Sequence, residues 1–292
     1  MKSYKTSAYK CASDLFATTV FRKVVRENDT ELFNVRAYRL LEACPDINPQ
    51  CTADLICKAY SILSEGYRVE YFYKNTILNE LLTKQRFLQD SIVVFNEFKI
   101  NKSIADVVYI NGKNRAYEIK TELDNPERLH NQIADYKKMF SEINIVTHVS
   151  LYEKYKQILN DDSIGIYILD ESLKIQIRRQ ATADNTKLDL EVMLKTLRKK
   201  EIICLVYDLA KIHVQTSNII FFEECLSILE ECDIIKVQLR VFYYLKKRGI
   251  NEKDMLLDVK TMNELKYLCL SLGFAKRDYE ILYNFLGLPI LK

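Results

Sequence analysis

Apolar residues along the chain change spacing twice. Up to about residue 88 they recur every three or four positions, as in amphipathic helices, and "CPDINPQC" at 44–51 separates two of these helices. In the helix expected at 67–88, Ile77, Leu78 and Leu81 share one arc, and Glu70 falls on the same arc two turns earlier. From residue 91 the segments become short and β-branched or aromatic, which is typical of strands. Beyond about residue 187 the helical spacing returns.

The central part predicts a mixed sheet. Three strands are expected first, with the turn signal "NGKN" before the third, and a helix starting at Asn125 or Asp124 with Pro126 in its first turn follows them. The order helix, three strands, helix, strand, helix, strand indicates an α/β domain with helices flanking a mixed central sheet. The expected strands are 91–100, 105–110, 115–120, 143–150 and 164–169.

Three domains follow from these changes of pattern. We expect a helical N-terminal region at 1–64, the α/β domain at 65–180 and an all-helical C-terminal domain at 185–292. The polar stretch "RRQATADNTK" at 178–187 is the predicted linker.

Composition excludes several classes of protein. The net charge of +3 over 292 residues leaves no polybasic tail, and six glycines provide no glycine-rich phosphate loop, which argues against an NTPase. The eight cysteines contain no C-x-x-C pair, so we expect reduced thiols in a cytoplasmic protein rather than a metal or iron–sulfur site. No signal peptide or membrane span is evident in the sequence, and no membrane partner is expected.

The candidate chemistry lies in "AYEIKTELDN" at 116–125. Glu118 and Lys120 share one face of a strand while Ile119 points the other way, and the preceding hairpin brings Asp106 to the same end of the sheet. Two clustered carboxylates repel unless a cation lies between them, and oxygen ligands suit Mg²⁺ or Mn²⁺. Such an ion would bind a scissile phosphodiester, Lys120 would orient the attacking water, and the Ile119 carbonyl could be a further ligand.

The segment "ADVVYINGKNRAYEIKT" resembles the core of the PD-(D/E)xK nuclease superfamily, over about residues 65–170. The resemblance implies a restriction-endonuclease-like core in which Asp106 and Glu118 are the metal acids and Lys120 is the catalytic lysine. "QIADY" is similar to the Q-x-x-x-Y motif of RecB-like members, which implies that Gln132 and Tyr136 shape the site or contact the nucleic-acid strand. Two more acids are implied, Glu70 on the first core helix and Glu97 as a metal ligand or a neighbour of one. Ala105 departs from the proline or arginine often found before the first acid, at a variable position.

The predicted function is a Mg²⁺-dependent endo- or exodeoxyribonuclease, with DNA favoured over RNA, serving restriction, phage defence, repair or recombination. The alternative is a catalytically inactive module of the same fold that binds nucleic acid or protein. A third possibility is an interaction protein in which the acidic end of the sheet is incidental. A second copy of the chain or a partner protein would bind through the helical domains. Individual residues also have simpler interpretations. Glu118 and Lys120 could be a solvent-facing strand pair, Gln132 and Tyr136 ordinary helix positions, and Glu70 a solvated one. The basic clusters at 197–200 and 245–249 could end helices or contact phosphates.

Overall fold

The computed structural model describes residues 6–66, 68–83, 93–112 and 114–290. Its centre is a six-stranded sheet in which every strand lies beside its neighbour in sequence. The pairs β1–β2, β2–β3 and β5–β6 are antiparallel and the pairs β3–β4 and β4–β5 are parallel, so the predicted mixed sheet is confirmed. The strands are β1 (Val93–Ile100), β2 (Ser103–Ile110), β3 (Arg115–Lys120), β4 (Glu142–His148), β5 (Gly165–Leu169) and β6 (Ile175–Arg179).

The sixth strand, β6, was not predicted, and it overlaps the first two residues of the predicted linker at 178–187. It is an edge strand with no fully buried residue, so its sequence carries little of the apolar signal that marks the buried strands. The polar stretch from 180 to 189 contains no helix or strand.

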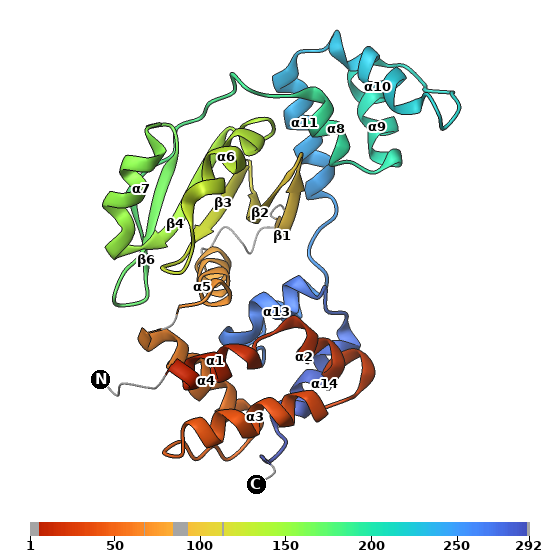
Figure 1. The fold of residues 1–292 in the computed structure, drawn as a ribbon. Helices are drawn as coiled ribbons and strands as arrows, with labels where there is room; N and C mark the ends of the chain where they lie inside the picture. Colours follow the sequence, from red (N-terminus) through yellow and green to blue (C-terminus); the bar gives the residue numbers. More distant parts are fainter. Residues whose placement is uncertain (1–5, 67, 84–92, 113, 291–292) are drawn as a thin grey trace.

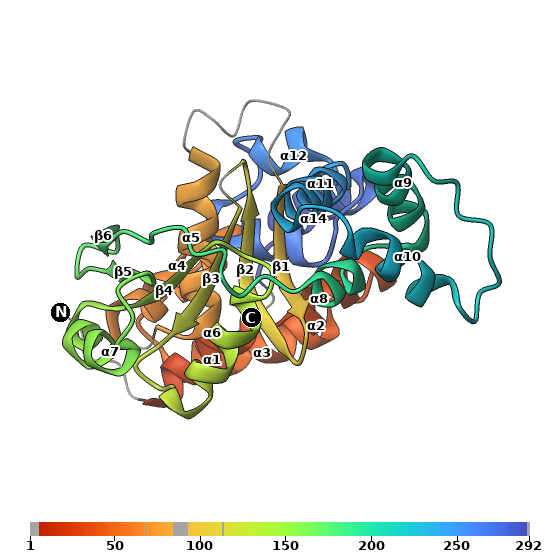
Figure 2. The ribbon, with the colours of Figure 1, turned by 90° about the horizontal axis from the view of Figure 1, so that it is seen from above.

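Helices cover both faces of the sheet (Figures 1 and 2). On one face α6 (Leu129–Lys137) packs against β2 and β4, and α7 (Tyr152–Leu159) packs against β5. On the other face α5 (Glu70–Thr83) contacts β3 and β6 and lies between this part of the sheet and the helices at the chain ends, while the chain-end helix at 266–271 contacts β1 directly. Ile77, Leu78 and Leu81 are buried on α5, as their shared arc predicts, whereas residues 84–88 of the expected helix lie outside the described residues.

Both ends of the chain build one helical unit. The N-terminal helices are interrupted at 44–51 as predicted, and Thr52 donates its backbone N–H to the Leu288 carbonyl at 2.9 Å. This unit shares an apolar cluster with α5 and one face of the sheet. Its members are α1 (Thr6–Leu15), α2 (Thr18–Arg22), the π-helix Lys23–Glu27, α3 (Glu31–Ala43), α4 (Thr52–Gly66), α12 (Lys253–Leu257), α13 (Lys266–Ser271) and α14 (Lys276–Leu286).

The helices after residue 185, grouped by sequence into one domain, therefore pack in two places. Four of them join the apolar cluster on the α6 face of the sheet, and Gln238 fixes them there by donating its amide N–H to the Met139 carbonyl at 2.8 Å. Apolar spacing predicts helices but not the surface that each helix covers. The sequence therefore does not show that the helices before and after about residue 250 pack in different places. These four are α8 (Leu190–Lys195), α9 (Lys199–Ala210), α10 (Phe221–Glu230) and α11 (Ile234–Lys246).

Only one of the two basic clusters ends a helix. Residues 245–249 close α11, as expected. Residues 197–200 instead lie where α8 has ended and α9 begins, with Arg198 as the N-cap residue of α9 and its backbone N–H bonded to Glu201. The helix-end interpretation of 197–200 is therefore wrong, because Lys199 and Lys200 lie in the first turn of α9.

All eight cysteines are free thiols, and Cys44, Cys225 and Cys269 are buried. Among the described residues no helix has both the length and the apolar character needed to cross a membrane.

Candidate active site

The candidate site forms where β2 and β3 separate. The two strands pair only over residues 107–109 and 115–117, while β3 continues to pair with β4 on its other edge. Beyond the last pair, the backbone N–H of Ile119 donates to a side chain of β2, Asp106 Oδ2, at 2.7 Å. The parting of the strands thus opens the space in which Asp106 and Glu118 approach each other.

A break in the β1–β2 ladder helps to place Asp106. The ladder pairs Asn96 with Val107 and Phe98 with Ala105, but it skips Glu97 and Asp106, which lie between these pairs. The φ of Glu97, 50°, lies in a region that non-glycine residues rarely adopt. Ala105 and Val108 belong to the same apolar cluster although they are three residues apart, and Val107 belongs to the opposite one. Strict alternation is therefore interrupted at Asp106.

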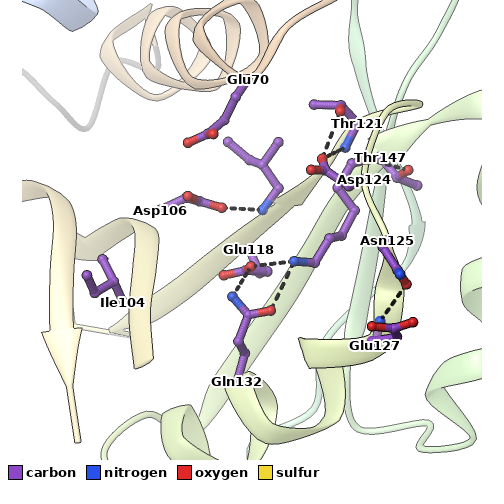
Figure 3. A network of polar contacts seen from close by, with 12 residues as sticks. Glu70, Ile104, Asp106, Glu118, Thr121, Asp124, Asn125, Glu127, Gln132 and Thr147 are labelled. Atoms are coloured by element: carbon purple, nitrogen blue, oxygen red, sulfur yellow. Dashed lines mark hydrogen bonds and ion pairs between the residues drawn. The ribbon is translucent and has the colours of Figure 1, made fainter. Parts of the chain in front are cut away.

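Glu118 is held by three side chains on the α6 side of the sheet, and Figure 3 shows its contact with Gln132. Lys120 Nζ lies 2.8 Å from Glu118 Oε1 and 2.9 Å from Gln132 Oε1, and the Gln132 amide N–H donates to the same Glu118 oxygen. The Tyr136 hydroxyl lies 2.6 Å from Glu118 Oε2 and 2.7 Å from the Ile104 carbonyl oxygen. Glu118, Lys120, Gln132 and Tyr136 therefore form one connected network.

Burial decides between the two interpretations of the strand pair. Glu118 is 2% exposed and Lys120 is 8% exposed, so the solvent-facing interpretation is wrong. Ile119 packs into the opposite apolar cluster, as alternation predicts. Burial and the neighbouring Glu118 carboxylate also raise the pKa of Tyr136, which remains a neutral hydroxyl.

A second lysine organises the acids on the α5 side. The Lys74 ammonium lies 3.3 Å from Asp106 Oδ1 and 3.4 Å from Glu97 Oε1, and it forms an ion pair with Glu70. Lys74 is 3% exposed and its ammonium lies over the Tyr267 ring, 5.7 Å from the ring centre. Glu70 begins α5 and points toward Asp106 (Figure 3). The two acids that the resemblance adds, Glu70 and Glu97, thus reach the site through Lys74.

The site carries more negative than positive charge. Four carboxylates, Glu70, Glu97, Asp106 and Glu118, face two ammonium groups, Lys74 and Lys120. Burial and the Glu118 charge raise the pKa of Asp106 to about 7, despite the opposing effects of the nearby ammonium and the amide that it accepts from. The excess charge would be relieved by a divalent cation.

The donor set suits a hard cation, although the carboxylates do not converge on one point. Within the described ranges, no three or more His, Cys, Asp or Glu side chains are grouped as a metal site. Both Glu118 oxygens face Lys120, Gln132 and Tyr136, and one Asp106 oxygen faces Lys74. Carboxylate oxygens with uncompensated charge fit Mg²⁺ or Mn²⁺ once these contacts rearrange. The backbone carbonyl of Ile119 remains a predicted ligand. The hydrogen bond between Ile119 and Asp106 uses the backbone N–H of Ile119 and not this carbonyl.

Comparison with known proteins places the chain in a family. Residues 64–280 match the family model described as bacteriophage P4 protein cII. The chain belongs to this family. No curated protein matches it. A solved structure, the SPO1766 protein of unknown function from Silicibacter pomeroyi, aligns at 18% identity with a TM-score of 0.26. The alignment covers 34% of the cII-family chain and 64% of the SPO1766 chain, so the cII-family chain spans less than two thirds of that neighbour.

Sequence reasoning missed one residue of the candidate site, Lys74. Lys74 belongs to no recognised motif, yet it lies four residues after Glu70, a spacing that places the two side chains together on a helix. That spacing was the available signal. The entry to α6 was better predicted: Asn125 caps the 3-10 turn Pro126–Arg128 by accepting from the Glu127 N–H, whereas Asp124 accepts from Thr121.

Proposed function

We propose that this cII-family protein is a metal-dependent nuclease that hydrolyses phosphodiester bonds, with DNA as its substrate. The observation that carries the proposal is the buried Glu118–Lys120 pair beside Asp106, a carboxyl group whose pKa is raised to about 7. A buried group of acids and lysines that includes a carboxyl with a raised pKa is costly to maintain and is characteristic of catalytic sites. The finer fold that accompanies this proposal is the restriction-endonuclease-like core, supported by the helix, three-strand meander and helix order from α5 to α6.

The residues divide the work. Asp106 and Glu118, with Glu70, Glu97 and the Ile119 carbonyl as further candidates, would hold Mg²⁺ or Mn²⁺. A bound ion of this kind polarises a phosphoryl oxygen and lowers the pKa of bound water. The Lys120 ammonium, fixed by Glu118 and Gln132, offsets negative charge that develops on the phosphate during attack and orients the water. Gln132 and Tyr136 hold Glu118 and Lys120 in place.

A matched pair of proteins tests the proposal. Wild type and Glu118→Gln are incubated with supercoiled plasmid and linear single-stranded DNA, in Mg²⁺, in Mn²⁺ and in chelator. We expect cleavage by wild type only with metal and a large loss in Glu118→Gln, since the amide has nearly the same shape but no charge for the cation. Cleavage in chelator, or undiminished cleavage by the variant, contradicts the mechanism.

A non-catalytic nucleic-acid-binding module is the second candidate. It is favoured by Lys74, whose ammonium already neutralises part of the carboxylate charge without any metal. DNA binding that is unaffected by divalent cations, with no cleavage under any of these conditions, would support this candidate.

A further inference from the structure

A groove runs along α6 beside the Glu118–Lys120 pair. It consists of two hollows of about 780 and 400 Å³ that share Arg128 and Gln132 in their walls. The larger hollow lies toward the β1–β2 turn and the smaller one reaches Lys120 and Asn125. Because Gln132 bonds both Glu118 and Lys120, a ligand along the groove would pass directly over the candidate site.

The wall of the larger hollow is structurally fixed. Asn101 in the β1–β2 turn and Ser103 at the start of β2 donate to the two carboxylate oxygens of Asp135 on α6, at 2.6 and 2.7 Å. Burial acts to raise the pKa of Asp135, but these hydrogen bonds outweigh it and hold the pKa below its usual range. Both oxygens of this acid are therefore engaged with the protein.

The exposed charged groups of the larger hollow are cationic, whereas the wall of the smaller hollow also carries the exposed acids Asp124 and Glu127. Lys102 and Arg128 are exposed, and within the described part of the chain neither forms an ion pair, while Lys138 lies 3.6 Å from Asp135. Lys102 lies in the β1–β2 turn, Arg128 precedes α6 and Lys138 follows its last residue, so the three cations are spread along the groove. Such spacing suits a chain of phosphates better than a single anion.

The floor adds an apolar contact. Ile104 is 52% exposed, although it sits in β2, and it lines the same hollow. A large exposed apolar side chain between cations offers a surface for a base or a sugar, which a free phosphate would not use.

We propose that the α6 groove binds one strand of nucleic acid, with Lys102, Arg128 and Lys138 contacting its phosphates, and guides it to the Glu118–Lys120 pair. This inference rests on the proposed function for its direction. Binding along the groove can nevertheless be measured without cleavage. The strand would run from the β1–β2 turn, past Gln132, to the beginning of α6.

The test compares two double charge reversals in chelator, by fluorescence anisotropy with a labelled single-stranded DNA oligonucleotide. Lys102→Glu/Arg128→Glu alters the groove. Lys154→Glu/Lys156→Glu makes the same charge change on exposed positions of α7. We expect the groove variant to lose on the order of tenfold or more in affinity and to flatten the plot of log affinity against log salt by about 1.4, as two lost phosphate contacts on a single strand predict. The α7 variant should bind nearly as wild type does. The conservative variant Lys102→Arg/Arg128→Lys keeps both positive charges and should also bind nearly as wild type does.

Equal losses in the two reversals, or wild-type affinity in the groove variant, overturn the groove proposal. Because all four positions are exposed, unchanged circular dichroism and melting temperature are expected and serve as the folding control. Failure of the nuclease proposal is distinguishable: groove-dependent binding without metal-dependent cleavage removes the nuclease and leaves the groove.

Discussion

The two lysines of the candidate site stand in different surroundings. Lys120 faces one buried carboxylate, Glu118, and its remaining bond goes to the neutral amide of Gln132. Lys74 faces three carboxylates, and the side chains of two of them, Glu70 and Glu97, are 56% and 67% exposed. The α6 side of the site is thus balanced in charge, whereas the α5 side is acidic and open to solvent.

The difference suggests separate duties for the two sides. A buried ion pair with all polar atoms bonded is rigid and can hold a fixed geometry. A cation shared among partly solvated acids can be exchanged for another cation, since water reaches the exposed carboxylates of Glu70 and Glu97. Under the proposed nuclease function, the Lys120 side would stabilise charge during the reaction and the Lys74 side would exchange its ammonium for a metal cation.

Lys120→Ala is expected to have the largest effect. Removing a positioned charge that acts on the reacting phosphate costs about 10²–10³ in rate. The single-turnover rate of DNA cleavage measures this loss, and Lys99→Ala, an exposed lysine on β1, is the matched control. A circular dichroism spectrum establishes that the variant is folded. A rate equal to that of Lys99→Ala would remove Lys120 from the mechanism.

Lys74→Met removes the ammonium shared by the three acids on the α5 side of the site. The substitution keeps the buried aliphatic stem but leaves Asp106 beside Glu70 and Glu97 without their shared cation, so we expect a loss of about 2–3 kcal/mol in the metal-free free energy of unfolding. The same change should tighten Mn²⁺ binding several-fold in calorimetry, because the ammonium no longer competes.

Lys58→Met is its control, since Lys58 forms a half-exposed pair with Asp54 at the same helical spacing. This control should lose less than about 1 kcal/mol. Weaker Mn²⁺ binding by Lys74→Met would mean that Lys74 supports the metal site rather than competing for it.

Asp106→Asn tests the charge environment of Asp106 through the dependence of stability on pH. Burial and Glu118 raise the folded pKa of Asp106 to about 7, above its unfolded value near 3.9. Between these values the folded protein binds more protons, so wild-type stability falls as pH rises from about 4 to about 7. The variant has no carboxyl to titrate at this position and does not lose this stability. Its free energy of unfolding should exceed that of wild type by about 1–2 kcal/mol at pH 8, with little difference at pH 4.

Asp135→Asn should show the opposite trend, which makes it the control. Although burial opposes it, hydrogen bonding lowers the folded pKa of Asp135, so its stabilisation is present above the unfolded pKa and is lost as pH falls through the folded pKa. Urea denaturation at several pH values measures both variants. Parallel pH profiles for the two would contradict the assigned charge environments.

The sequence predicted the balanced side of the site far better than the acidic side. Alternation along β3 places Glu118 with Lys120, and the four-residue spacing on α6 places Gln132 with Tyr136, so local periodicity contains nearly the whole network. Lys74 has one local partner, Glu70, but it was missed because Glu97 and Asp106 reach it from β1 and β2. The break at Glu97 was missed because nothing in its residue type requires a positive φ.

Fold prediction divided in the same way. Five strands and most helices have strong apolar periodicity and were predicted, whereas β6, with its exposed edge, was not. The packing of residues 250–290 against the N-terminal helices depends on contacts such as Thr52 with Leu288, which no local pattern contains.

Tyr136→Phe is expected to have the smallest effect. It removes a hydroxyl that lies between Glu118 and the Ile104 carbonyl, at a cost of about 1 kcal/mol in unfolding free energy. Tyr155→Phe is a close control, because Tyr155 is fully buried on α7 and its hydroxyl has no hydrogen-bond partner among the described residues.

Removing that second hydroxyl should therefore leave stability unchanged or slightly raised, since an unbonded buried hydroxyl is itself costly. Chemical denaturation of the two variants gives the comparison directly. If both lose the same stability, the Tyr136 hydroxyl contributes no specific bond to Glu118, and the rigidity assigned to the Lys120 side would have to come from Gln132 and Lys120 alone.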